Sequence, residues 1–270
     1  MISVTLKGLS VLQFNNLTRF PEVFHFSTIR TGGLSNASYE SLNLGFNSGD
    51  VPERVLANRK LLCTAIELSS NRIIFPKQTH TAAIKVITEE FLSADEETRN
   101  QYLKDTDSII TNQLDICIAV KTADCVPVLL FDPRQRVVAA IHAGWRGTAQ
   151  NIVMKTIDKM VADFGSTPSD LIAGIGPSIS PHVYEVSSDV YNLFDRELYE
   201  ETAPPKIDKR MLNLWKANHN QLTRAGVEVQ NIETANLCTF SDRDRFFSAR
   251  RDGAKTGRMA TGILLIQPLH

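Results

Sequence analysis

Two residue types that catalyse reactions or bind metals stand at the ends of two neighbouring apolar segments. Residues 127–131 and 137–141 have the continuous aliphatic character of buried strands, and turn-forming residues separate them. If the strands pair across a turn centred on Arg134, the sequence numbers of any two paired residues add up to 268. Cys125 and His142 then belong to two pairs that lie next to each other. The sequence therefore predicts that Cys125 and His142 emerge side by side at the open end of one hairpin.

A cysteine beside a histidine supports three interpretations. The pair can be the nucleophile and base of a cysteine hydrolase, two ligands of a zinc site, or strand-end residues without a role. A third ligand would favour zinc, and His80 is the best candidate because it lies in a polar loop between two predicted strands. His182, in a loop after a proline, is a weaker one. Of the remaining histidines, His25 is expected in the core, His219 on a solvated helix face and His270 at the chain end.

Several short motifs follow one another along the chain. They are KQTH at 77–80, ADCVP at 123–127, HAGWRG at 142–147 and GIGPSI at 174–179. Further segments of the same pattern lie at 27–35, 42–45, 238–239, 246–252 and 256–258. In this order the motifs resemble those of the YfiH/YlmD family, long labelled multicopper polyphenol oxidoreductases or laccase-domain proteins. The resemblance runs nearly from end to end, and its HAGWRG and ADC blocks are the most specific.

The resemblance implies layered mixed β-sheets with flanking helices and one zinc ion held by His80, Cys125 and His142. It also implies phosphorolysis of adenosine, inosine, guanosine and S-methyl-5′-thioadenosine, together with deamination of adenosine. The older label implies copper and oxidation of phenols. A multicopper centre needs a cluster rich in histidine, which six histidines in the whole chain do not supply. We therefore expect zinc, with copper as the alternative metal.

Phosphorolysis needs cationic groups for phosphate, and the planar fork of arginine matches phosphate oxygens. The candidate substrate-binding residues are Arg30, Asn43, Arg59, Gln78, Arg146 and Arg250, with Arg251 as a further phosphate candidate. Each of these residues can instead have a purely structural role. An arginine can be a solvated surface charge, Asn43 can stabilise a turn, and Gln78 can support His80. Asp124 is either a general base or a residue that orients the metal loop. Trp145 is expected to wall the pocket.

The elements that must position these residues mix strands with helices. We expect strands at 73–75, 83–87, 115–120, 127–131, 137–141, 171–175 and 263–266, and helices at 52–62, 187–194 and 211–225. A further helix is predicted from an N-cap at Thr148 to a stop at Gly165, and Asp50 is a plausible cap for the first one. The N-terminal third is expected to be rich in loops, and Pro204-Pro205 to lie in a surface loop. Hairpins together with crossovers favour an α+β fold with a mixed sheet.

Composition excludes several classes of protein. The chain has 270 residues, of which 43% are hydrophobic and 22% charged, so we expect a single catalytic domain over 1–270. The net charge of −1 argues against a non-specific nucleic-acid binder, and the apolar runs are too short to span a bilayer. The first residues do not resemble a signal peptide, so we expect a cytoplasmic protein whose four cysteines are thiols. The expected partners are purine nucleosides and phosphate, without nucleic acid or membrane.

Three hypotheses of different classes follow. The first is a zinc-dependent purine nucleoside phosphorylase with adenosine deaminase activity. The second is a hydrolase that uses Cys125 as nucleophile and His142 as base, and would stay active after chelation of metals. The third is a binding protein for purines or for a partner, which would bind without turnover.

Overall fold

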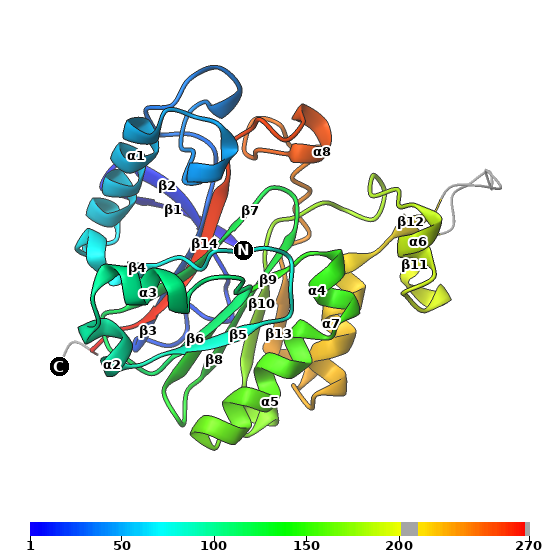
Figure 1. Cartoon of the computed structure of the whole chain (residues 1–270). Coiled ribbons are helices and arrows are strands. Elements are labelled where there is room, and N and C mark those ends of the chain that lie inside the picture. Colours follow the sequence, from blue (N-terminus) through cyan, green and yellow to red (C-terminus); the bar gives the residue numbers. More distant parts are fainter. Residues whose placement is uncertain (201–209, 268–270) are drawn as a thin grey trace.

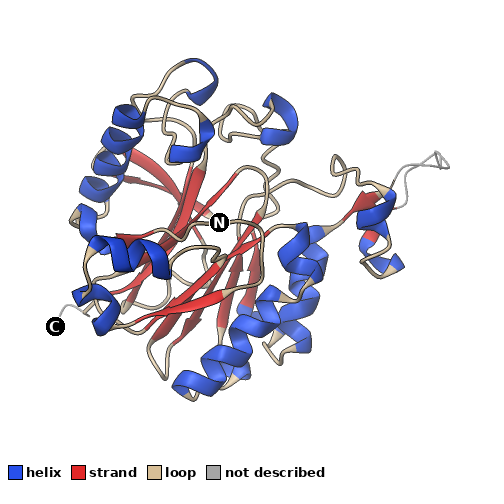
Figure 2. Ribbon diagram, in the orientation of Figure 1, coloured by secondary structure: helices blue, strands red, loops and turns tan. Residues whose placement is uncertain are grey.

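The strands form two large mixed sheets that stack face to face between layers of helices. The computed structural model describes residues 1–200 and 210–267. Within these residues each of the two large sheets has six strands, and most helices lie on the outside of the stack (Figures 1 and 2). The order of layers is therefore helix, sheet, sheet, helix, which confirms the expected α+β class with layered mixed sheets and flanking helices.

The first sheet contains the three N-terminal strands and the last strand of the chain. Its order is β1 (Ile2–Leu6), β2 (Leu9–Gln13), β3 (Val23–Thr28), β14 (Met259–Leu265), β7 (Cys117–Thr122) and β4 (Ile73–Ile74). Neighbouring strands are antiparallel except β7 and β4. Helix α1 (Pro52–Ala65) packs on the outer face of this sheet, where Leu62 and Ala65 join Val11 and Phe26 in one apolar cluster.

The second sheet carries the predicted hairpin at its centre. Its order is β13 (Ile232–Thr234), β10 (Ile172–Ile175), β8 (Val126–Asp132), β9 (Val137–Ala143), β6 (Ser108–Thr111) and β5 (Ile84–Ile87). Its outer face is covered by α4 (Trp145–Ala149), α5 (Ile152–Phe164) and α7 (Leu214–Arg224). The strand pairs β13/β10 and β6/β5 are parallel, and the others are antiparallel.

Shorter elements connect and extend the two sheets. The remaining α-helices are α2 (Glu89–Ser93), α3 (Glu96–Tyr102), α6 (Ser188–Tyr191) and α8 (Ala249–Asp252). Strands β11 (Tyr199–Glu200) and β12 (Met211–Leu212) form a small separate sheet beside α6 (Figure 1). Short 3₁₀ helices span Ala37–Tyr39, Phe46–Ser48, Ser70–Arg72, Pro168–Asp170, Arg196–Leu198 and Val229–Asn231.

Strand β8 shows why the central strands are apolar on both faces. Leu129 and Phe131 point between the two sheets, whereas Val128 and Leu130 point toward the helices. All four side chains are fully buried. Successive residues of a strand face opposite sides, so a strand covered on both faces is an uninterrupted apolar run, as observed in the sequence.

The predicted hairpin is present, but its register differs by one residue. Val126 pairs with Ala143 and Pro127 with His142, so partner numbers sum to 269 rather than 268. The reason is the turn, in which Asp132 pairs with Val137 and four residues form the loop. The carboxylate of Asp132 accepts hydrogen bonds from two backbone amides of this loop. Cys125 and His142 nevertheless lie at the same end of the hairpin.

Two predicted helix caps are wrong. Thr148 lies inside α4, and α5 begins only at Ile152 after Asn151, whose φ of 60° interrupts the helical path. Val51, not Asp50, caps α1, because the carboxylate of Asp50 accepts hydrogen bonds from Ser35 and Asn43. The predicted stop of α5 at Gly165 is confirmed by its left-handed φ of 69°, which glycine adopts without strain.

Other boundaries were also imprecise. The loop-rich N-terminal third contains β1 to β3, and the helices expected at 187–194 and 211–225 shorten to α6 and α7. Pro204-Pro205 and His270 lie outside the described residues. The four cysteines are unpaired. No helix among the described residues has the length and apolar character needed to cross a membrane.

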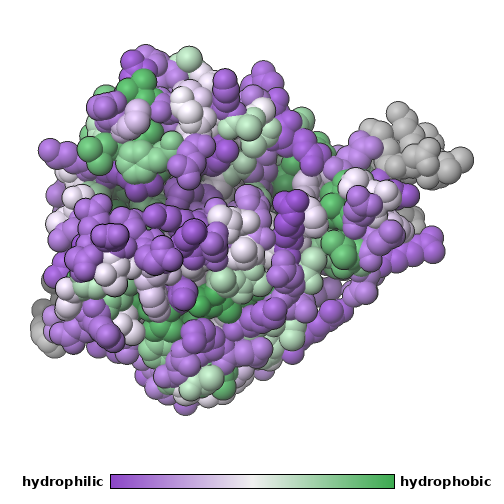
Figure 3. Space-filling view, in the orientation of Figure 1, coloured by the Kyte–Doolittle hydropathy of each residue, from purple (hydrophilic) through white to green (hydrophobic). Residues whose placement is uncertain are grey.

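The surface over α1 is partly apolar. Apolar side chains are visible in this region of the space-filling view (Figure 3). Leu56 is 63% exposed there, and Val51 and Phe46 are also exposed. Helix α1 therefore packs on its sheet through a small set of residues, including Val55 and Leu62, rather than through a wide apolar face.

Candidate metal centre

Three side chains with metal-binding atoms converge where the hairpin ends. The ligand atoms of His80, Cys125 and His142 all lie within 4.8 Å of one another. His142 is in β9, Cys125 immediately precedes β8, and His80 lies in the loop before β5. The rings of His80 and His142 are 4.9 Å apart, centroid to centroid, at an interplanar angle of 72°. His142 is buried and His80 is exposed, so the group is open to solvent on one side.

The carboxylate of Asp107 holds two of these residues in place. Its Oδ1 lies 2.7 Å from His142 Nδ1 and accepts the backbone N–H of His80 at 3.1 Å. Its Oδ2 accepts the N–H and hydroxyl of Thr81, both at 2.8 Å, and the N–H of Thr79 at 3.3 Å. Asp107 is fully buried and directly precedes β6, the neighbour of β9. One side chain therefore orients the His142 ring and fixes the loop that carries His80.

The loop is also anchored to the other sheet. Both amide atoms of Gln78 bond the backbone of Lys121 in β7, with Nε2 donating to its carbonyl at 2.7 Å and Oε1 accepting its N–H at 2.9 Å. His80 itself has a φ of 65°, a left-handed conformation that is uncommon outside glycine. The bonds to Asp107 and Lys121 compensate for this conformation. Gln78 thus supports His80, which was one of its two expected roles.

The charges of the site favour a thiolate. Burial would raise the pKa of Cys125, but the charge of His142 and hydrogen bonds from both histidines lower it below its usual value. Burial would likewise lower the pKa of His142, but Cys125 and Asp107 raise it. Burial opposes ionisation of Asp107 too, yet His142 and Thr81 bring its pKa down to about 2. A thiolate is the form of cysteine that binds metals and attacks electrophiles.

Small and aromatic residues shape the space around the group. A Cβ added to Gly144 would lie 2.9 Å from Cys125 Sγ and 3.3 Å from His80 Cδ2, so only glycine leaves room for the two ligands. Tyr184 is buried, and its burial together with the charge of Cys125 raises the pKa of its phenol. Trp145 follows Gly144 at the start of α4 and is half-buried.

Asp124 lies in the loop between β7 and β8, and its hydrogen bonds connect this loop to neighbouring segments. Its Oδ1 accepts the hydroxyl of Thr239 at 2.7 Å, and its Oδ2 accepts the backbone N–H of Arg250 at 2.8 Å. Its backbone carbonyl accepts the N–H of Ile179. With both oxygens engaged, Asp124 is placed to orient the segment that contains Cys125, which was the alternative to its role as a general base.

The candidate arginines have three kinds of environment. Arg30 and Arg251 donate to backbone carbonyls, so they connect loops: Arg30 bonds the carbonyls of Glu40 and Arg243, and Arg251 bonds three others. Arg146 and Arg250 are exposed and stack on aromatic rings. The guanidinium carbon of Arg146 lies 4.4 Å from the ring centroid of Trp145, and that of Arg250 lies 5.0 Å from the ring centroid of Tyr184. Arg59 stacks on Phe46 and Phe75.

Other polar candidates have structural roles. Asn43 is fully buried, and its side chain bonds Ser48, Asp50, Gly45 and Arg258, so no polar atom is left for a substrate. Asn43 therefore stabilises a turn, which was the alternative to binding substrate.

The histidines outside the metal group also differ in environment. His25 is 1% exposed and accepts the N–H of Phe14, as expected for a core histidine. His182 is exposed and is not part of the metal group. His219 was predicted to be solvated, but it is half-buried on α7.

Sequence reasoning missed Asp107, Tyr184 and Lys121. Asp107 stands directly before an apolar β-branched run, Ser108–Thr111, and an aspartate at the start of a buried strand is a detectable signal. Its closeness to His142 depends on the pairing of β6 with β9, which local pattern does not reveal.

Comparison with known proteins agrees with the motifs. The family model described as "Multi-copper polyphenol oxidoreductase laccase" matches residues 24–266. A purine nucleoside phosphorylase of Bacteroides thetaiotaomicron is 38% identical over 98% of this chain and 99% of its own. The adenosine deaminase RL5, from an unknown prokaryotic organism, is 34% identical over 88% of this chain and 92% of its own.

Solved structures show the same fold. The crystal structure of the YfiH protein of Bacillus licheniformis superposes with a TM-score of 0.86 at 32% identity, covering 94% of this chain and 96% of that one. Residues 24–266, which the family model matches, include the metal group and the whole second sheet. The chain therefore belongs to the YfiH/YlmD family of enzymes, whose model carries the laccase description and whose named members include purine nucleoside phosphorylases.

Proposed function

We propose that the chain is a zinc-dependent purine nucleoside phosphorylase that also deaminates adenosine. The observation that carries the proposal is the convergence of His80, Cys125 and His142 within 4.8 Å. Adenosine, inosine, guanosine and S-methyl-5′-thioadenosine are the proposed nucleosides, and phosphate is the second substrate. Relatives named purine nucleoside phosphorylase and adenosine deaminase support this choice. We propose that residues 1–270 act as one catalytic domain, and the cytoplasmic location stays a prediction.

The three side chains fit a zinc ion. Two imidazoles and a thiolate are ligands that zinc prefers, and three protein ligands with a fourth position open are typical of catalytic zinc. The hydrogen bond between Asp107 and His142 Nδ1 leaves Nε2 of His142 free to bind the metal, as in other histidine ligands held by carboxylates. The exposed side of His80 leaves a path for substrate. When bound, zinc would supply a Lewis acid at this position.

The two reactions place different demands on the chain. In phosphorolysis an oxygen of phosphate bonds the anomeric carbon while the bond to the purine nitrogen breaks. The purine leaves with the electron pair and takes up a proton. In deamination water adds to the carbon that bears the amino group, and ammonia leaves. Arg146 and Arg250, exposed beside Trp145 and Tyr184, are proposed to bind substrate at the entrance, and Gly144 leaves the space for the ligands.

The test uses zinc-loaded protein and adenosine, with and without phosphate. Adenine and ribose 1-phosphate formed only with phosphate demonstrate phosphorolysis, and inosine formed without phosphate demonstrates deamination. A Cys125→Ser variant serves as the matched control, because it removes the thiolate and keeps the size of the side chain. Failure of the metal-loaded protein to form either product would sink the proposal.

The contact between Cys125 and His142 favours a cysteine hydrolase as the second candidate. A hydrolase would retain full activity after chelation and lose it on alkylation of the thiol. Zinc bound at near-stoichiometric amounts in purified protein would argue against it. Copper chemistry of the laccase type would require further metal sites, and only one His/Cys group of metal-binding geometry occurs in residues 1–200 and 210–267.

A further inference from the structure

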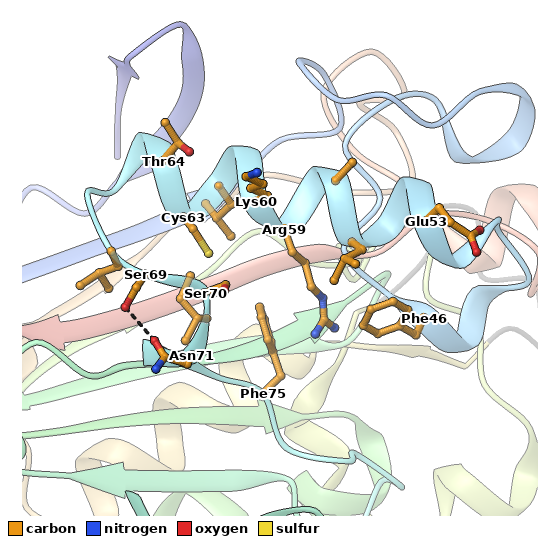
Figure 4. A pocket seen from close by; sticks show the side chains of 15 residues that line it. Phe46, Glu53, Arg59, Lys60, Cys63, Thr64, Ser69, Ser70, Asn71 and Phe75 are labelled. Carbon is orange, nitrogen blue, oxygen red and sulfur yellow. Dashed lines mark hydrogen bonds between the residues drawn. The ribbon is translucent and has the colours of Figure 1, made fainter. Parts of the chain in front are cut away.

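Arg59 extends from α1 into a cleft between two aromatic rings. Its guanidinium carbon lies 4.3 Å from the centroid of Phe46 and 4.4 Å from that of Phe75. Figure 4 shows the three side chains together at one end of the cleft, which has a volume of about 780 Å³. Nε and one terminal nitrogen donate to the carbonyl of Leu44, at 3.1 and 2.9 Å. The rings and the carbonyl fix the orientation of the guanidinium without neutralising its charge.

Lys121 approaches the same ring from β7. Its Nζ lies 5.0 Å from the centroid of Phe75 and donates to the carbonyl of Pro76 at 3.1 Å. The side chains of both Arg59 and Lys121 are held by aromatic rings and backbone carbonyls. No acidic residue in the described part of the chain forms an ion pair with either of them.

Two cations without acidic partners at one ring are electrostatically unfavourable. Burial, followed by the charge of Arg59, lowers the pKa of Lys121 to about 7, and burial lowers that of Arg59 to about 10. Asp107 is the acid that partly offsets the charge of Lys121, but its oxygens already bond His142 and residues 79–81. An anion placed beside both cations would remove this cost, since a desolvated charge is stabilised by a partner of opposite sign.

This pair of cations adjoins the loop that carries the metal ligand His80. Lys121 bonds Pro76 through its Nζ and Gln78 through its backbone, and His80 follows two residues later. The cleft that Arg59 and Phe75 line opens Arg59 to solvent, so a small anion can reach it from the α1 side (Figure 4). Lys121 lies behind this lining, against the ring of Phe75.

We propose that Arg59 and Lys121 together bind the phosphate that phosphorolysis consumes. This inference rests on the proposed function. Phosphate at neutral pH carries one to two negative charges, which two cations match. The fork of arginine can bond two phosphate oxygens, and lysine adds a compact charge. Arg59 was one of several arginine candidates, whereas Lys121 is a new assignment.

The first experiment measures binding of inorganic phosphate to zinc-loaded protein by titration calorimetry, which needs no turnover. Lys121→Met and Arg59→Gln are each expected to weaken binding at least about tenfold. The control is Lys85→Met, since Lys85 also lies over an aromatic ring, 4.7 Å from the centroid of Tyr102, and it should bind phosphate within about twofold of wild type. If Arg59→Gln fails to fold, Lys121→Met decides alone. A wild-type protein that does not bind phosphate, or a Lys121→Met variant that binds it normally, would overturn the inference.

The second experiment separates an anion site from a structural role. In Lys121→Met the KM for phosphate should rise at least about tenfold, while zinc content and phosphate-independent deamination stay within about twofold. Loss of zinc and of deamination together would show that Lys121 only supports the His80 loop. Adenosine 5′-monophosphate is titrated in parallel, and dependence of its binding alone on Lys121 would also overturn the assignment to free phosphate. Phosphate binding that depends on Lys121 without nucleoside cleavage would refute the proposed function and leave the anion site standing.

Discussion

Replacing Asp107 by asparagine tests whether one carboxylate positions two metal ligands. The substitution keeps the shape of the side chain and changes one acceptor oxygen into an NH₂ donor. Each oxygen of Asp107 faces donors, because Oδ1 meets His142 Nδ1 and the N–H of His80, and Oδ2 meets the groups of residues 79 and 81. The NH₂ group of an asparagine therefore meets donors in either orientation of the amide. If it takes the place of Oδ2, it cannot accept the bonds from residues 79 and 81, and the His80 loop is released. If it takes the place of Oδ1, it donates to Nδ1 of His142 and favours the tautomer that carries its proton on Nε2.

The size of the effect follows from this geometry. Loss of a partner that orients a metal-bound histidine typically weakens metal affinity about 10–100-fold, which is about 1.4–2.7 kcal/mol. Because Asp107 contacts two ligands, we expect the upper part of this range. Zinc affinity is measured by competition with a chelating dye, and folding by circular dichroism and urea unfolding.

Asp132 supplies a matched control for this substitution. It is also fully buried, but its Oδ1 accepts both of its hydrogen bonds and its Oδ2 accepts none. Asp132→Asn can therefore keep both bonds and should change zinc affinity by less than about twofold. A folded Asp107→Asn protein that binds zinc as tightly as wild type would refute the reasoning.

Three further predictions address the metal group and the core. Cys125→Ser should lose at least about 100-fold in zinc affinity by dye competition, because the hydroxyl does not ionise as the thiol does. Burial lowers the pKa of His25 from 6.5 to about 4, so the folded state resists protonation, and about 3 kcal/mol of stability should be lost as pH falls from 6.5 to 4. Urea unfolding of metal-free protein should show this loss, and His25→Gln, which keeps an acceptor for Phe14, should lack it. Leu129→Ala, at a fully buried site, should cost about 2–5 kcal/mol in the same assay, whereas Leu56→Ala, at a site 63% exposed, should cost less than about 0.5 kcal/mol.

The hairpin could be predicted because its signals are local. An apolar run, a turn and a second apolar run determine that the two strands pair, and this alone brings Cys125 close to His142. The register was wrong by one residue because the length of the turn depends on its hydrogen bonds, here those of Asp132 with the loop amides. The error did not separate the two residues, since both stand at the same end of the paired strands.

Contacts between distant segments could not be predicted in this way. Asp107 meets His142 only because β6 pairs with β9, and Gln78 meets Lys121 only because the His80 loop crosses to the other sheet. Strand β3 was missed because Val23–Thr28 is buried on almost every position and lacks the alternation of a half-exposed strand. The motifs at 77–80 and 142–147 pointed to the metal ligands His80 and His142, but Asp107, which contacts both of them, lies outside both motifs.

The arrangement also determines how two substitutions should combine. Asp107 touches the metal group only through His142 and the His80 loop, so its contribution to catalysis should act through the bound metal. In a Cys125→Ser background, at a zinc concentration too low for that variant to hold zinc, adding Asp107→Asn should cost little further activity. Residues that act through one shared group give such non-additive effects, whereas independent residues give additive ones. The measurement is a double-mutant cycle on deamination rates at limiting zinc, with Leu129→Ala as the distant comparison. Additive losses for Asp107→Asn and Cys125→Ser would mean that Asp107 acts on the substrate by a route that does not involve the metal ligands.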